Sequence, residues 1–186
     1  SEKQIFYFQD LLKESGKPEH IDLFYALLHM QLSLDIHDLI ELKFNSSSEE
    51  KRNQTNQLQV LVGDFHSSYF YRILSEQNYL DELYHFIKYI KEINELKMTL
   101  LHSEASDLNS QLDQIESVHC GLFNSVIDLY GLTEYKNKKI SELVTSLVYQ
   151  SQSVWLDLLK SKEPSTELMI NERINRLNKM SYTGES

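Results

Sequence analysis

The chain has 186 residues, 41% of them hydrophobic, which fits one domain with a sizeable core. Eighteen basic and 28 acidic residues give a net charge of −10, which argues against binding to nucleic acid or to an anionic membrane surface. No apolar run approaches the roughly 20 residues of a membrane span, and a single cysteine, Cys120, excludes an intramolecular disulfide. The start shows no leader pattern, so we expect a cytoplasmic protein.

Few turn residues are present, since the whole chain holds five glycines and two prolines. This scarcity favours long helices, and we predict an all-α protein: one helical domain over 1–186 with its core at about 19–160. Apolar periodicity predicts helices at 1–14, 19–42, 58–74, 79–102, 105–130, 133–160 and 166–180. The polar segment 43–57 is predicted to be a mobile linker, and 164–186 a final helix with a frayed tail.

The stretch 58–74, LQVLVGDFHSSYFYRIL, combines an apolar stripe with an unusual glycine. The stripe recurs every three or four positions and is predicted to be a buried helix face, made of Leu58, Leu61, Val62, Phe65, Tyr69 and Ile73. Gly63 costs about 1 kcal/mol in a helix relative to alanine, so we expect another group to approach its backbone closely. The pair Gly63-Asp64 is accordingly expected to be buried.

Val60–Phe65, VLVGDF, resembles the V-L-x-G-D-[FY] helix of the trans-prenyl diphosphate synthases. These all-α enzymes elongate allylic diphosphates with isopentenyl diphosphate, and the resemblance covers about 19–160. It implies an isoprenoid-synthase-like helical bundle, here degenerate and shortened. In that family two Asp-rich motifs hold the magnesium ions that bridge to the allylic diphosphate.

The first Asp-rich motif, H-D-D-x-x-D in the family, is incomplete in this chain. Aligned on His37-Asp38, it keeps Asp38 alone, because Leu39 and Leu42 stand at the positions of the other two aspartates. Magnesium needs converging carboxylates to clamp a diphosphate, and Asp38 with Glu41 is a poor substitute. The alternative interpretation is that His37 and Asp38 make local hydrogen bonds near a helix end.

The other phosphate-handling elements of the family are also eroded. In 149–157, YQSQSVWLD, which resembles F-Q-x-x-D-D-x-x-D, only Asp157 remains. Val118-His119 stand in place of a Lys-Thr pair whose lysine contacts diphosphate in the family. Lys51-Arg52 is a weak remnant of the pair of diphosphate-binding arginines that the family has in this segment. Loss of all these elements implies a chain without catalytic or metal-binding residues of its own.

Within that superfamily the chain resembles the small subunits, component 1, of bacterial heterodimeric heptaprenyl or hexaprenyl diphosphate synthases, and the residues that carry this resemblance are Leu34–Asp38, Asn56–Asp64, Leu74–Glu76 and Lys91–Lys97. The resemblance implies a partner, the catalytic large subunit, which would carry Mg²⁺ and both substrates. It also implies that this chain governs the activity and product length of the pair in menaquinone side-chain synthesis. No nucleic acid or membrane insertion is expected.

The helix predicted at 79–102 carries a stripe wider than one neighbouring helix would cover. We therefore nominate Phe86, Ile90 and Ile93 for the partner interface, and expect that the isolated chain could form homodimers.

Two other functions stay open. One is a self-sufficient Mg²⁺-dependent prenyl or terpenoid enzyme, and the other is an unrelated helical interaction protein. The enzyme would use the remaining carboxylates Asp38, Glu41 and Asp157.

A rival metal site arises from two Glu-x-x-His patterns. Glu82 with His85, and Glu116 with His119, have the spacing that puts a carboxylate and an imidazole on one face of a di-iron bundle. Such a bundle also needs glutamates on two intervening helices, and these two patterns lie on consecutive helices. Ordinary helix charges are the simpler explanation.

Overall fold

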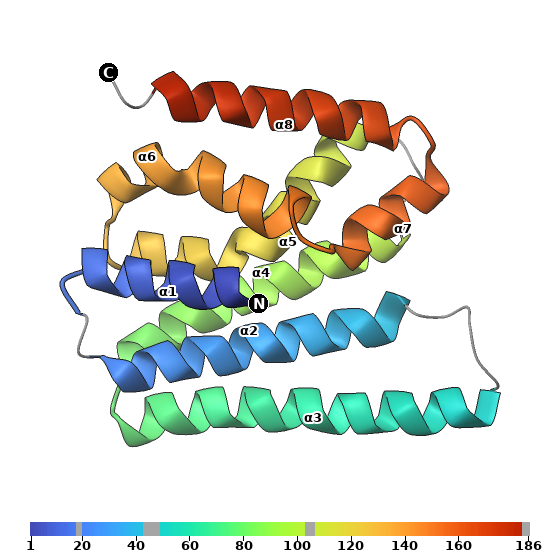
Figure 1. Ribbon diagram of the computed structural model, residues 1–186. Helices are drawn as coiled ribbons and strands as arrows, with labels where there is room; N and C mark the ends of the chain where they lie inside the picture. The colour runs from blue at the N-terminus through green and yellow to red at the C-terminus, as the bar shows by residue number, and fades with distance from the viewer. Residues whose placement is uncertain (18–19, 43–48, 103–106, 184–186) are drawn as a thin grey trace.

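The computed structural model describes residues 1–17, 20–42, 49–102 and 107–183 (Figure 1). The described residues form eight α-helices and one π-helical turn, with no β-strand among them, so the predicted all-α class is confirmed. The elements are α1 (Glu2–Glu14), α2 (Ile21–Leu42), α3 (Glu49–Glu76), α4 (Leu80–His102), α5 (Leu108–Leu129), α6 (Thr133–Val144), η1 (Thr145–Tyr149), α7 (Val154–Lys162) and α8 (Thr166–Thr183). None of these helices combines the length and apolar character that crossing a membrane requires.

The helices stack from α3 at one end of the molecule to α8 at the other (Figure 1). Helix α2 lies between α3 and α1, α4 pairs with α5, which passes behind α1, and α6 runs beneath α8. Helix α1 packs on α5 through aromatic rings, because Phe8 and Phe123 stack with their centroids 4.1 Å apart. Both rings are fully buried, as are Phe70, Phe86 and Trp155. One continuous core therefore joins the helices at the centre of the bundle.

The polar segment predicted as a linker is partly helical. Helix α3 begins at Glu49, so 49–57 belongs to it, and 43–48 lie outside the described residues. Glutamate, lysine, arginine and glutamine are good helix formers without any apolar period, and an acidic residue suits a first helical turn. A search for apolar periodicity does not detect such a helix.

The helix predicted at 58–74 is present, but its predicted buried face is wrong. The buried residues of α3 are Gly63, Phe70 and Leu74, of which Gly63 lies against His37 of α2 and Phe70 contacts Phe86 of α4. Most of the predicted stripe instead faces solvent, with Leu58, Leu61 and Phe65 exposed by 62%, 65% and 54%, whereas Tyr69 and Ile73 are half-buried. Asp64 of the predicted buried pair is exposed as well. The apolar periodicity of 58–74 correctly indicated an apolar helix face, but it gave no information on whether another helix covers that face.

Two helical glycines mark the closest approaches between helices. A Cβ on Gly63 would lie 2.7 Å from Nε2 of His37 on α2, which confirms that another group crowds this backbone. A Cβ on Gly121 of α5 would lie 2.7 Å from Cγ1 of Ile93 on α4. The side chain of His37 has more room to move than that of Ile93, because His37 is 35% exposed whereas Ile93 is 2% exposed.

We expect Gly121→Ala to lower the free energy of unfolding by about 1–3 kcal/mol, because Ile93 has no space into which to move. Gly63→Ala is the matched control. There the ring of His37 can turn toward solvent, and alanine gains about 1 kcal/mol of helix propensity, so the net change should stay within about 1 kcal/mol. Urea unfolding of both variants measures the difference. Equal losses would mean that Ile93 relaxes as easily as His37.

The helix predicted over 133–160 is interrupted. It runs as α6 to Val144, widens into the π-helical turn η1, and restarts as α7 after residues 150–153. Ser153 caps the new helix with extended backbone and accepts a hydrogen bond from the N–H of Leu156 at 3.2 Å. The hydroxyl of Ser151 donates to the carbonyl of Leu147 at 2.5 Å. This interruption exposes a short segment at the rim of a cavity.

Candidate functional site

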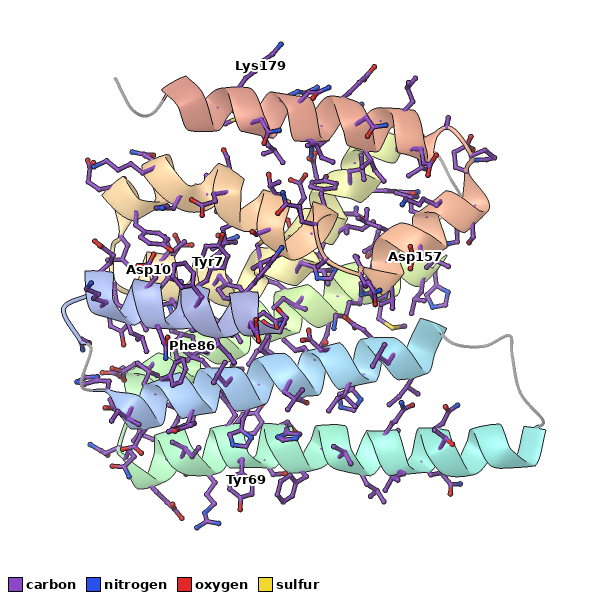
Figure 2. All side chains as sticks on the ribbon, in the orientation of Figure 1. Tyr7, Asp10, Tyr69, Phe86, Asp157 and Lys179 are labelled. Carbon is purple, nitrogen blue, oxygen red and sulfur yellow. The ribbon has the colours of Figure 1, made fainter. Side chains whose placement is uncertain are left out.

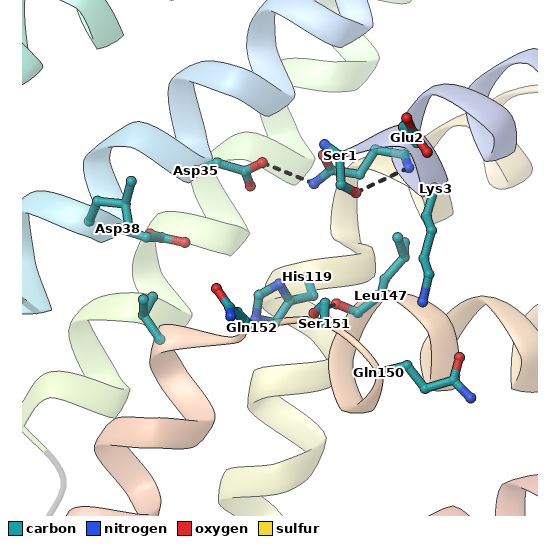
Figure 3. A pocket seen from close by; sticks show the side chains of 13 residues that line it. Ser1, Glu2, Lys3, Asp35, Asp38, His119, Leu147, Gln150, Ser151 and Gln152 are labelled. Carbon is teal, nitrogen blue, oxygen red and sulfur yellow. Dashed lines mark hydrogen bonds between the residues drawn. The ribbon is translucent and has the colours of Figure 1, made fainter.

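The stretches that resemble the family's catalytic elements meet at one cavity of about 520 Å³ (Figure 3). Helix α2 contributes Asp35 and Asp38, α5 contributes His119, and the interruption before α7 contributes Gln150 and Gln152. The N-terminal turn of α1 closes one side. The sequence reasoning thus selected elements that are far apart in the chain and adjacent in space.

Of the two remaining motif aspartates, the cavity includes only one. Asp38 lines it, whereas Asp157 is exposed on the first turn of α7 and is not among the lining residues (Figure 2). The side chains of Glu41, Lys51 and Arg52 lie outside the described part of the chain. Within the described ranges, no group of three His, Cys, Asp or Glu side chains is placed to hold a metal ion.

Asp38 is neutralised by a lysine of the same chain. Nζ of Lys97 on α4 lies 2.5 Å from Oδ1 of Asp38, and their side chains are only 6% and 10% exposed. Nζ of Lys97 also donates to the carbonyl of Leu34 at 3.4 Å. Burial raises the pKa of Asp38, while the neighbouring Lys97 opposes that rise. A fixed cation therefore sits where the carboxylate would otherwise be open to a metal.

Lys97 was missed by the sequence reasoning, although a signal was present. Buried residues of α4 recur at alternating spacings of three and four: Phe86, Ile90, Ile93, Lys97 and Leu100. A lysine at a core position of such a stripe is a candidate for a buried ion pair, because lysine is almost never fully buried unless paired. Its partner could not have been chosen without knowing that α4 passes α2 at Asp38.

Where the resembled family has a Lys-Thr pair, this chain has Val118, which is apolar, and His119, whose ring is neutral at neutral pH. Nε2 of His119 lies 2.7 Å from the hydroxyl of Ser153, the cap of α7. Burial, with a smaller effect from Lys97, lowers the pKa of His119 to about 4. At neutral pH this element therefore offers no positive charge to a diphosphate.

The rest of the lining is unsuited to an anion. Asp35 accepts hydrogen bonds of 2.9 Å from Nε2 of both Gln4 and Gln31, which ties α1 to α2 (Figure 3). Lys3 at the mouth donates to the carbonyl of Ser146 at 3.4 Å. Among the lining residues, carboxylates outnumber lysine, so the cavity lacks the cations that a diphosphate requires.

The two Glu-x-x-His patterns have other partners in the structure. Glu116 accepts hydrogen bonds from Tyr149 at 2.5 Å and from Nε of Arg173 at 2.8 Å. The ring of His85 lies 3.0 Å from the carbonyl of Ser125. Glu116 thus ties α5 to η1 and α8, and these patterns serve helix packing.

The three residues nominated for a partner interface lie in the core of this chain. Phe86, Ile90 and Ile93 are exposed by 0%, 8% and 2%, and Ile93 is pressed against Gly121 of α5 (Figure 2 labels Phe86). A partner could not reach these side chains in this conformation. The stripe of α4 is wide because α4 packs on both α3 and α5 of its own chain.

Residues 1–162 match the family described as heptaprenyl diphosphate synthase (HEPPP synthase) subunit 1. The match spans α1 to α7 and therefore includes every element of the cavity, with α8 beyond its end. No solved structure matches the chain. The chain belongs to the heptaprenyl diphosphate synthase subunit 1 family.

Proposed function

We propose that this chain is the auxiliary, non-catalytic subunit of a heteromeric heptaprenyl diphosphate synthase. The family makes it a subunit of such a synthase. The observation that carries the finer proposal is the buried pair of Asp38 and Lys97. It occupies the one motif carboxylate of the cavity with an internal cation, and among the described residues no group of three His, Cys, Asp or Glu side chains is placed to hold Mg²⁺.

In this proposal the chemistry takes place in a catalytic large subunit. That subunit would hold Mg²⁺ and condense isopentenyl diphosphate with an allylic diphosphate, while this chain stabilises its active form and limits the product length. An apolar channel stops a growing isoprenoid where no further unit can be buried, so bulky side chains beside it set the length. The product would be heptaprenyl, or hexaprenyl, diphosphate, the precursor of the menaquinone side chain.

The test is an assay with farnesyl diphosphate, labelled isopentenyl diphosphate and Mg²⁺. This chain alone, the large subunit alone and their mixture are compared, and long-chain product is expected from the mixture alone. Product from this chain by itself would instead establish a self-sufficient prenyl enzyme. A large subunit that makes the same product with or without this chain would contradict the auxiliary role.

A double variant tests whether Asp38 and Lys97 have a structural or a catalytic role. Asp38→Asn combined with Lys97→Met replaces the ion pair by neutral groups of similar size. Because neither group holds metal in this proposal, the mixture should keep its activity and its Mg²⁺ dependence. Loss of activity with an unchanged unfolding midpoint would mean that Asp38 takes part in the reaction.

A further inference from the structure

Helices α2 and α3 share an exposed apolar face that carries little charge. We define the α2–α3 apolar face by its exposed or half-exposed members, Ile21, Tyr25, Leu32, Leu58, Leu61, Val62, Phe65 and Tyr69. On α2, Ile21 and Tyr25 are 59% and 52% exposed. On α3, Leu58 and Leu61 are 62% and 65% exposed. Contiguous apolar surface of this kind marks an interaction site.

Aromatic contacts show that the two helices present these residues on the same side. His29 of α2 lies one turn after Tyr25, and its ring stacks on Tyr69 of α3 with centroids 5.1 Å apart. Tyr69 in turn contacts Phe65, one turn earlier, at 4.7 Å. Nδ1 of His29 also lies 2.8 Å from Nδ1 of His66. These rings form a seam between α2 and α3 that joins both stripes into one surface and fixes its side chains before any partner arrives.

Charge is almost absent from this surface. One of the 17 residues in 55–71 is charged, against 25% for the whole chain, and this residue, Asp64, lies 3.6 Å from His37. Asp22 is the single charged residue in 21–34. By contrast, the outer side of α8 carries exposed charges, among them Glu172 and Arg176. Depletion of charge distinguishes the core of an interface from ordinary solvated surface.

We propose that the α2–α3 apolar face is the surface on which the catalytic subunit docks, through an equally uncharged helical face of its own. This inference rests on the proposed function, because it takes the occupant to be the other subunit of the synthase. The net charge of −10 favours that occupant over a second copy, since two copies would approach with the same sign of charge. Helix α3 packs chiefly on α2, so most of its remaining circumference is left for a partner.

The experiment uses two charge-introducing double variants. Leu61→Asp with Phe65→Asp places two carboxylates at the centre of the face. Leu168→Asp with Met180→Asp, at sites 68% and 54% exposed on α8, places the same charges at the opposite end of the molecule (Figure 1). Analytical ultracentrifugation with the large subunit measures affinity, and the assay above measures activity. All four sites are exposed, so unfolding midpoints should stay close to that of the wild type.

We expect the Leu61 and Phe65 variant to bind at least about 100-fold more weakly and to lose activity in the mixture, since truncations at the centre of an interface dominate its energy. The α8 variant should bind and activate as the wild type does. Normal binding by the α3 variant would overturn the docking inference and leave the proposed function intact. Failure of the wild-type chain to bind or activate would instead overturn the proposed function. If the α3 variant abolishes only a homodimer of this chain, the face belongs to a second copy and the inference fails.

Discussion

Replacing Lys97 with methionine should lower the free energy of unfolding by about 3–5 kcal/mol, the usual loss when one partner of a buried ion pair is removed. Asp38 would remain 10% exposed without its counter-ion. Burial already raises the pKa of Asp38 and Lys97 opposes that rise, so the variant should raise it further. The folded variant would then hold a proton that the unfolded chain releases. Its loss of stability should therefore shrink as the pH is lowered.

Two controls isolate the buried pair. Lys91→Met removes a lysine from the same helix whose partner is Glu95, at 3.5 Å, with side chains 73% and 63% exposed. An exposed pair contributes at most about 1 kcal/mol, so this variant should change stability little. Adding Asp38→Asn to Lys97→Met should recover most of the loss. A urea midpoint for Lys97→Met no lower than that for Lys91→Met would contradict a buried, mutually dependent pair.

Acid should destabilise the protein through His119. Its pKa is lowered from the ordinary 6.5 to about 4, so below pH 6.5 the unfolded chain binds a proton that the folded protein excludes. Stability should therefore fall by about 1.4 kcal/mol per pH unit between 6.5 and 4, about 3 kcal/mol in all. Below pH 4 both states are protonated and this contribution stops changing. His119→Gln keeps a hydrogen-bonding group for Ser153 and should remove that part of the pH dependence.

The measurement is the difference between the stability profiles of the wild type and His119→Gln from pH 7.5 to 4. Other groups contribute equally to both profiles, including His29, whose pKa is lowered by burial and by His66. His102→Gln, at the exposed end of α4, is the matched control. Parallel profiles for the wild type and His119→Gln would mean that the ring of His119 becomes protonated as readily when folded as when unfolded.

The helices could be predicted from the sequence wherever apolar residues recur at helical spacing, because this spacing fixes one face of a helix. Two errors in the predicted helix boundaries have the same cause. The start of α3 at Glu49 has no apolar residues to detect, and the interruption at 145–153 depends on a capping serine inside an otherwise apolar pattern. Local hydrogen bonds decide such boundaries, and periodicity does not register them.

The site was predictable in part, through the residues that resemble the family's motifs. Asp38 and His119 do meet at one cavity, and Asp157 does not join them. The interface nomination shows the limit of periodicity most clearly, because both α3 and α4 carry apolar stripes. The stripe with Ile90 is covered by this chain, whereas the stripe with Leu61 is open. Which stripe is covered depends on tertiary packing, and one sequence contains no direct record of it.

The open stripe of α3 bears on how much of this protein a cell can hold. A copy without a partner keeps Leu61 and Phe65 in contact with water, and such surfaces adhere to one another and to chaperones. Binding removes this hazard and stabilises the folded state by mass action. Synthesis of the two subunits in matched amounts should therefore keep the chain in solution, and surplus copies should be short-lived. Overproduction of this subunit alone should yield mostly aggregated or degraded protein.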